Sequence, residues 1–293
     1  MDLQNNIATP GVTKELLDKY NIRLSKRLGQ NFLVDRDIID IIVAAGDIGE
    51  NDNLIEIGPG FGSLTQAILE KLGRGRLFAI EKDDRLVKVL LDLFEENQLE
   101  IINKDVMDID WSNFLEENNL LNKTIKLIAN LPYYITTPII LGLLEAKVPI
   151  DRYVFMVQKE VAERMAADPG GKEYGSLSIA VQYFSSPEIV HIVPSSVFIP
   201  RPAVDSAVIK LERNIEPPVI LESEEFFFQI VKAIFQQRRK NIKNGLSKAA
   251  NIDLDKDLVL NCLDKMGLDK RIRGEKLSIQ QIGQLSNLLY LNG

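Results

Sequence analysis

The stretch LIEIGPGFG, Leu54–Gly62, decides the fold, because an apolar, β-prone run passes into three closely spaced glycines and then into a helical pattern at Ser63–Leu72. Glycines in such a turn let the backbone bend tightly and approach a ligand beside the N–H groups of a helix start. Alone, the pattern is also compatible with a tight strand-to-helix turn that binds nothing. Its ligand has to be inferred from the residues around it.

The surrounding sequence alternates short apolar runs with helical patterns from about residue 53 to residue 212. This alternation predicts an α/β fold with a mainly parallel sheet covered by helices. The predicted strands are residues 53–57, 76–80, 100–103, 124–129 and 152–157, with a later pair near 188–193 and 206–211. Residues 177–184 fit a helix by spacing and a strand by composition, and we interpret them as a helix.

Strand patterns end after Leu211, and the segment Glu216-Pro217-Pro218 continues neither a helix nor a strand. The rest of the chain predicts helices at 224–246, 258–266 and 278–291, the last with Ser278 as N-cap and Gln281 in capping-box position. We therefore predict an N-terminal arm (1–24), an α/β domain (25–213) and a small all-α domain (214–293).

Composition narrows the class of protein. The chain has 293 residues and a single cysteine, Cys262, which excludes a disulfide framework and a cysteine metal cage. It has no run of 18 apolar residues and no signal-peptide pattern at its start, so we expect a cytoplasmic protein without a membrane span or a metal. The lone histidine, His191, falls in a predicted strand and is interpreted as structural.

Two acidic residues follow the strands after the glycine turn. Glu81 lies 23 residues after Gly58, at the strand end from which a carboxylate reaches a ribose diol, and Asp105 lies where it would accept a hydrogen bond from an adenine amino group. NAD and S-adenosylmethionine both fit these positions. The third glycine, Gly62, comes one residue too early for the dinucleotide fingerprint, and Glu56 suits a cationic sulfonium, so the residues favour S-adenosylmethionine.

A polar and aromatic motif, Asn130-Leu131-Pro132-Tyr133, follows the fourth strand. The Asn130 amide and the Leu131 carbonyl can accept the two protons of an exocyclic amine, Pro132 fixes the turn, and Tyr133 can stack on a flipped-out base. Two acceptors that hold both protons out of the ring plane would localise the nitrogen lone pair and aim it at a methyl group. Such catalysis depends on positioning and needs no general base before attack.

Five separated motifs together resemble one protein family. They are Gly29–Leu33, Glu56–Gly60, Asn130–Tyr133, Val197–Ser206 and Arg273–Ser278. In order and spacing, from about Lys26 to the end of the chain, they look like the KsgA/RsmA family of small-subunit ribosomal RNA adenine dimethyltransferases.

The resemblance implies a class I S-adenosylmethionine-dependent methyltransferase, with a Rossmann-like, mostly parallel seven-stranded sheet and a helical C-terminal domain. It implies methyl transfer to N6 of two adjacent adenosines in the 3′-terminal hairpin loop of 16S rRNA during small-subunit biogenesis. The cofactor residues carried over are Asn31, Leu33, Gly58, Gly60, Glu81, Asp105 and Asn130. The catalytic residues are Asn130, Leu131, Pro132, Tyr133 and Phe198, with Tyr133 and Phe198 enclosing the target base.

Charge is distributed unevenly along the chain. The formal net charge is −7, but residues 214–293 carry 12 basic and 10 acidic residues, which leaves the excess of acid in residues 1–213. Two acid-free basic segments, Lys19–Val34 and Val231–Lys248, suggest contacts with RNA phosphates, although a basic helix face can also be merely solvated. The candidate RNA-binding residues are Lys26, Arg27, Arg238, Arg239, Lys240 and Lys243.

The expected partner is small-subunit rRNA in a pre-ribosomal particle, and we expect a monomer. Three other functions remain open: a large-subunit rRNA adenine methyltransferase of the antibiotic-resistance type, a ribosome-assembly factor that is non-catalytic or has a dual role, and a nicotinamide oxidoreductase.

Overall fold

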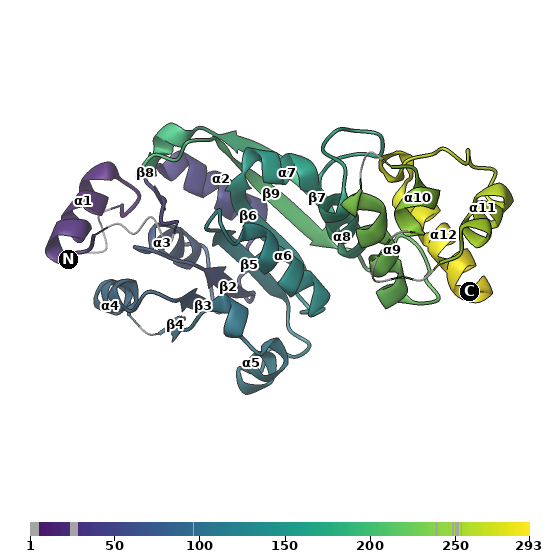
Figure 1. The fold of residues 1–293 in the computed structure, drawn as a ribbon. Coiled ribbons are helices and arrows are strands. Elements are labelled where there is room, and N and C mark those ends of the chain that lie inside the picture. Colours follow the sequence, from purple (N-terminus) through teal and green to yellow (C-terminus); the bar gives the residue numbers. More distant parts are fainter. Residues whose placement is uncertain are drawn as a thin grey trace. The chain divides into compact units, whose positions relative to one another are not determined.

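The computed structural model describes residues 6–23, 29–95, 97–237, 240–247, 249, 252 and 254–293. The chain forms two compact units, one of residues 1–162 and 188–213 and one of residues 163–187 and 214–293. Figure 1 shows the strands in the first unit and the run of C-terminal helices in the second. Each unit is described separately below.

The first unit is built on a seven-stranded sheet in the order β4-β3-β2-β5-β6-β9-β7. Its strands are β2 (Asn53–Ile57), β3 (Arg76–Glu81), β4 (Leu99–Asn103), β5 (Ile125–Asn130), β6 (Arg152–Gln158), β7 (Ser185–Val193) and β9 (Ser206–Arg213). Strands β2 to β6 pair in parallel, and β9 pairs with β6 in antiparallel register. The predicted strands and the mostly parallel sheet are confirmed, with ends that differ by a few residues.

Helices cover both faces of this sheet. They are α2 (Arg36–Gly46), α3 (Ser63–Leu69), α4 (Asp84–Leu93), α5 (Trp111–Glu117), α6 (Thr136–Glu145) and α7 (Lys159–Met165), with a short 3-10 helix η2 (Val106–Asp108) after β4. The sheet alternates its side chains between faces: Leu77 joins the core formed with α2, α3 and α4, whereas its neighbour Phe78 meets Phe114 of α5, with ring centroids 5.5 Å apart. Helix α6 lies in front of the strands in the view of Figure 1.

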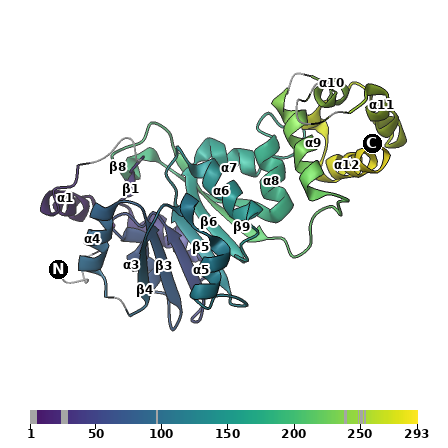
Figure 2. The same ribbon diagram turned by 60° about the horizontal axis from the view of Figure 1, so that its bottom comes forward.

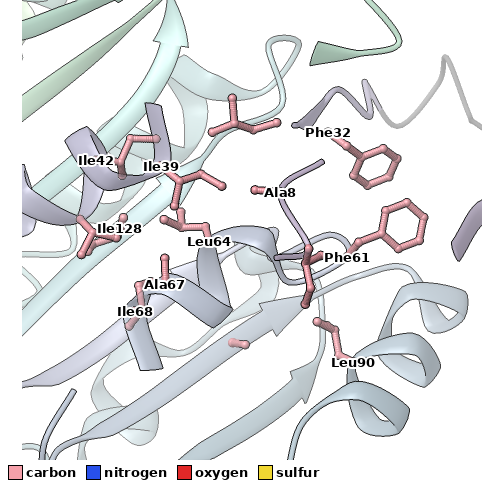
Figure 3. Packing of buried hydrophobic residues seen from close by; sticks show 14 of the residues in the cluster. Ala8, Phe32, Ile39, Ile42, Phe61, Leu64, Ala67, Ile68, Leu90 and Ile128 are labelled. Carbon is pink, nitrogen blue, oxygen red and sulfur yellow. The ribbon is translucent and has the colours of Figure 1, made fainter. Parts of the chain in front are cut away.

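Figure 3 shows part of the core of the first unit, where Ile39 and Ile42 of α2 point toward Ile128 of β5 and toward α3. Phe32 and Phe61 lie side by side at one end of this core, with ring centroids 4.4 Å apart. Burial of such aliphatic and aromatic side chains contributes roughly 25 cal/mol per Å². This core therefore fixes the turn that follows β2.

A second, two-stranded sheet pairs β1 (Phe32–Leu33) with β8 (Phe198–Ile199), which follows the 3-10 helix η3 (Ser195–Val197). Figure 2 shows β1 and β8 together, apart from the row of strands in the large sheet. The sequence analysis did not predict these short strands. They matter because they carry Leu33 and Phe198, two candidate site residues.

The predicted N-terminal arm is part of the first unit where the structure describes it. Helix α1 (Pro10–Lys19) buries Leu16 in the core shared with α2, α3 and α4. The Ile7 backbone N–H donates to Gln66 Oε1 of α3 at 3.0 Å. The apolar residues of this segment give it packing partners, so residues 6–23 are not a separate arm.

The second unit is helical, with α8 (Ser176–Phe184), α9 (Glu224–Gln236), α10 (Ile242–Leu246), α11 (Lys256–Lys265), the 3-10 helix η4 (Gly274–Lys276) and α12 (Ile279–Asn292). The capping box of Ser278 and Gln281 is confirmed. The interpretation of residues 177–184 as a helix is also confirmed. Among the described residues, no helix is long and apolar enough to cross a membrane.

Two expectations about the second unit are corrected. Residues 163–187, which we placed in the α/β domain, belong to the helical unit, because Ile179 and Tyr183 of α8 join its core. The helix expected over 224–246 is broken: Asn241 caps a new helix by accepting a hydrogen bond from the Asn244 N–H at 3.0 Å. The described part of the basic segment Val231–Lys248 is therefore divided between α9 and α10 and does not lie on one continuous helix.

Candidate functional site

A pocket in the first unit lies at the carboxyl ends of β2, β3 and β5, where open α/β sheets bind ligands. It is lined by all seven predicted cofactor residues: Asn31, Leu33, Gly58, Gly60, Glu81, Asp105 and Asn130. The predicted catalytic residues Leu131, Pro132 and Tyr133 also line it. The structure thus brings together residues that are up to about a hundred positions apart in the sequence.

The glycine turn forms one wall of the pocket. Gly58, Gly60 and Gly62 have φ values of 68°, 63° and 86°, a backbone region that side chains with a Cβ rarely adopt. A Cβ on Gly62 would lie 2.4 Å from the Phe94 ring. Both the backbone conformation and the close packing therefore require glycine there, and the turn ends where α3 begins.

Glu81 is held at the end of β3 by backbone donors. Its carboxylate accepts hydrogen bonds from the Asp83 N–H at 2.8 Å and from the Gly60 N–H at 3.4 Å. The side chain is 8% exposed, and burial raises its pKa to about 7. The carboxylate faces the same pocket as the glycine turn, so it can accept hydrogen bonds from a diol held there.

Glu56 is a second buried carboxyl group in the pocket wall, and it is only 1% exposed. The Thr65 hydroxyl donates to its Oε2 at 2.7 Å. Burial is the main reason why its pKa is raised to about 8, and the negative charge of Glu81 raises it further. A cation bound nearby would stabilise the ionised form of Glu56, so these two carboxyl groups fit a positively charged ligand.

Asp105 caps η2 at the pocket edge, where its Oδ1 accepts a hydrogen bond from the Met107 N–H at 3.0 Å. Its Oδ2 forms an ion pair with Lys82 Nζ at 2.5 Å, which is the main reason why the pKa of Asp105 is lowered. Asp105 is therefore an ionised acceptor. Lys82, which also lines the pocket, was missed by the sequence analysis, although its place directly after Glu81 is a usable signal.

Asn130 ends β5 with its amide in a defined orientation. Its Nδ2 donates to the backbone oxygen of Asn31 at 3.1 Å. This contact uses one of the two N–H groups of the amide and orients it, and within the described parts of the chain no donor reaches Oδ1. The acceptor end is therefore available to a substrate amine.

The residues after Asn130 continue into a rigid turn. The Leu131 N–H donates to the Met156 carbonyl at 3.1 Å, which extends the ladder between β5 and β6 by one residue. The Pro132 carbonyl accepts a hydrogen bond from the Thr136 hydroxyl at 2.9 Å at the start of α6. Both ends of the turn are thus anchored.

Tyr133 is half-buried in the pocket wall, and its hydroxyl forms a hydrogen bond of 2.6 Å with Ser206 Oγ. Burial raises the pKa of this phenol above its usual value. The next residue, Tyr134, is 54% exposed and lies against Gly29, so it lines the pocket mouth as well. Tyr134 is not among the site residues predicted from the sequence.

Phe198 lies elsewhere than we expected. Its side chain is 2% exposed and belongs to the core of the first unit, because β8 pairs with β1 and turns the ring inward. It is not among the residues that line the pocket. The aromatic pair expected around a base is therefore not present in this arrangement, because Tyr133 lines the pocket and Phe198 does not.

The candidate RNA-binding residues are described only in part. Lys240 is exposed, and Lys243 is partly exposed in α10. Lys26, Arg27, Arg238 and Arg239 lie outside the described residues. His191 is exposed in β7 and does not line the pocket. In the described ranges, no group of three or more potential metal-binding side chains is found.

Comparisons with known proteins agree with this geometry. The sequence pattern of the family described as "Ribosomal RNA adenine dimethylase" matches residues 21–289. The protein named ribosomal RNA small subunit methyltransferase A from Halothermothrix orenii is 54% identical over 97% of this chain and 94% of that protein. The protein of the same name from Alkaliphilus oremlandii is 46% identical over 97% of this chain and 98% of its own length.

Two solved structures are also similar. A dimethyladenosine transferase from Plasmodium falciparum has a TM-score of 0.70 and 26% identity, covering 89% of this chain and 97% of that chain. The 23S rRNA methyltransferase ErmE has a TM-score of 0.67 and 26% identity, and the match covers 89% of this chain and 100% of that chain. Because the family pattern matches residues 21–289, nearly the whole chain, the chain belongs to the ribosomal RNA adenine dimethylase family.

Proposed function

We propose that this chain transfers methyl groups from S-adenosylmethionine to N6 of two adjacent adenosines in the 3′-terminal hairpin loop of small-subunit rRNA. The proposed substrate is a pre-ribosomal particle in the cytoplasm, and the proposed active form is a monomer. The observation that carries the proposal is the Asn130 amide, whose acceptor end is left for an amine beside two buried carboxyl groups. Relatives at 54% and 46% identity, both named for the small subunit, support the choice of RNA.

The pocket residues divide into a cofactor side and a base side. We assign the ribose diol to Glu81, the adenine amino group to Asp105, and the neighbourhood of the positive charge to Glu56. Asn31, Leu33 and the glycines would form the adjoining walls. When bound, S-adenosylmethionine supplies an electrophilic methyl group.

On the base side, Asn130 Oδ1 and the Leu131 carbonyl would accept the two N6 protons, and Tyr133 would stack on the ring. Holding both protons out of the ring plane directs the nitrogen lone pair toward the methyl group. Attack would form the N–C bond as the S–C bond of the cofactor breaks, and the proton that N6 then loses would pass to water. The rate depends on orientation and on the local electrostatic field, and the residues assigned to the base side contain no general base. Phe198 would join the base only if β8 moved away from β1.

The basic residues of the second unit would track RNA phosphates outside the pocket. Lys240 and Lys243 are available at the surface, and their proposed contacts should weaken as salt is added. We extend the same proposal to Lys26, Arg27, Arg238 and Arg239 from the charge pattern of the sequence alone.

The similarity to ErmE makes a large-subunit rRNA methyltransferase the second candidate. The test incubates the purified protein and labelled S-adenosylmethionine with undermethylated small subunits and, separately, with protein-free large-subunit RNA. We expect label in the small-subunit RNA. Label in the large-subunit RNA alone would overturn the choice of substrate, and particle binding without label would favour an assembly factor.

A further inference from the structure

The geometry points to Ser206 as a positioning residue for the target base, because its hydroxyl holds the Tyr133 ring at the pocket wall. This inference rests on the proposed function, in which Tyr133 stacks on an adenine. Ser206 is the last residue of the Val197–Ser206 motif and has no role in the proposed reaction so far.

The contact links two segments that are 73 residues apart in the chain. Ser206 Oγ and the Tyr133 hydroxyl lie 2.6 Å apart, and Ser206 is completely buried. Ser206 is the first residue of β9 and pairs with Gln158 of β6. The hydroxyl therefore projects from a rigid strand, whereas Tyr133 lies in the turn between β5 and α6.

The residue before Ser206 fixes the start of β9 from two further sides. The Asp205 carbonyl accepts a hydrogen bond from the Lys159 N–H at 3.0 Å, and its carboxylate Oδ1 accepts one from the Ser195 N–H at 2.9 Å. These bonds leave the Ser206 backbone little freedom to move away from Tyr133. The bond from Ser195 also holds η3, which leads to Phe198, beside the start of β9.

A stacking ring has two side-chain torsions, and packing against one wall alone does not fix both. The bond to Ser206 ties the far end of the ring to the sheet, so the face presented to the pocket is defined before a base arrives. A neutral hydrogen bond of this kind contributes enough to change a rate by about 3- to 10-fold.

The second methyl transfer should depend on this anchor more than the first. After the first transfer only one N6 proton remains for the two acceptors, so base stacking holds a larger share of the orientation. Loss of the Ser206 hydroxyl should therefore cause monomethyladenosine to accumulate. A role of Ser206 in stability alone would lower both transfers equally through the fraction of folded protein.

The first experiment compares Ser206→Ala, Tyr133→Phe and the double variant on undermethylated small subunits. Ser185→Ala is the control, because Ser185 is equally buried and its hydroxyl donates to the Val181 carbonyl outside the site. We expect kcat to fall about 3- to 10-fold in both single variants, with KM for S-adenosylmethionine unchanged and monomethyladenosine accumulating. The double variant should match the single ones, because both changes remove the same bond.

Normal kcat and a normal product ratio in Ser206→Ala, or losses that multiply in the double variant, would overturn the inference. Ser206→Cys keeps the size and a weaker hydrogen bond, so its kcat should fall between those of Ser206→Ala and the unchanged protein. Thermal unfolding of each variant verifies that it is folded at the assay temperature.

A second measurement reads the ring without any turnover. The seven tyrosines are labelled as 3-fluorotyrosine, and the Tyr133 resonance is assigned from its absence in Tyr133→Phe. We expect Ser206→Ala to shift and broaden that resonance and Ser185→Ala to leave it unchanged. An unchanged resonance in Ser206→Ala would contradict the positioning role. If Ser206→Ala shifts the Tyr133 resonance but Tyr133→Ala keeps full activity, Ser206 does position the ring and the proposed function of Tyr133 is wrong.

Discussion

Two segments of the first unit each carry an aromatic residue that we expected at the target base, and the structure treats them differently. Leu131–Tyr134 follows β5, a central strand, and Tyr133 and Tyr134 both line the pocket. Phe198 lies in β8, a two-residue strand paired with β1, and its ring is buried in the core. One aromatic residue faces the pocket and the other supports its wall.

The difference shows what places a side chain at a site. The position of Tyr133 follows from the sheet, because the carboxyl ends of neighbouring parallel strands meet at one edge. The position of Phe198 depends on a pairing with residues 32–33, more than 160 positions earlier in the chain. The same kind of residue therefore acts at the pocket in one segment and as core in the other.

The largest expected effect tests the segment after β5. Asn130→Ala removes the amide acceptor, so methyl transfer should fall about 10²- to 10³-fold, as when one oriented polar group of an active site is lost. Binding to small subunits should change by less than about 2-fold, because the phosphate contacts remain. Asn118→Ala is the control, since the Asn118 amide bonds only to Phe114 O within the described residues. Normal turnover of Asn130→Ala would refute the assigned role.

The next effect tests the buried segment. Phe198→Ala leaves a cavity beside β1, so the free energy of unfolding should fall by about 3–4 kcal/mol in chemical denaturation. Phe198→Leu keeps most of the apolar volume and should cost only about 1 kcal/mol. If Phe198→Leu is stable but loses methyl transfer, the ring does reach the base during the reaction, and the contrast between the segments fails.

Tyr133→Ala should lose methyl transfer with little loss of stability, the opposite of what we expect for Phe198→Leu and Phe198→Ala. Loss of a stacking ring costs about 1–3 kcal/mol of base binding, which is about a 5- to 150-fold loss of methyl transfer. Because Tyr133 is only half-buried, the free energy of unfolding should fall by less than about 1.5 kcal/mol. A large loss of stability with normal methyl transfer would assign Tyr133 to the core and not to the base.

Sequence reasoning succeeded where function and local structure follow from the same short motif. The glycine turn, Glu81, Asp105 and Asn130 each lie at or just after the end of a parallel strand, so their meeting at one sheet edge could be predicted. It failed where the outcome depends on distant pairings. The burial of Phe198 depends on β1, and the helix break before α10 depends on the Asn241 cap and on the hydrogen bond from the Ile242 N–H to the Ile272 carbonyl.

A smaller effect concerns Glu56, which is buried like Phe198 but lines the pocket like Tyr133. Its pKa is raised from 4.5 to about 8, so the folded protein retains a proton that the unfolded chain releases, and stability falls as pH rises across that range. Glu56→Gln removes this dependence and should be more stable than the unchanged protein at pH 8.5 without ligand, by a margin that shrinks as the pH falls. Parallel stability curves of the two proteins from pH 5 to 8.5 would contradict the raised pKa.

In the proposed reaction, the pocket holds adenosine N6 of small-subunit rRNA for methylation. The most direct measurement treats undermethylated small subunits with the purified protein and S-adenosylmethionine, digests the RNA and maps methylated adenosines by mass spectrometry, with Asn130→Ala in parallel. We expect two adjacent N6,N6-dimethyladenosines near the 3′ end with the unchanged protein and none with the variant. Unmethylated small-subunit RNA, or the same products with Asn130→Ala, would contradict the proposed reaction.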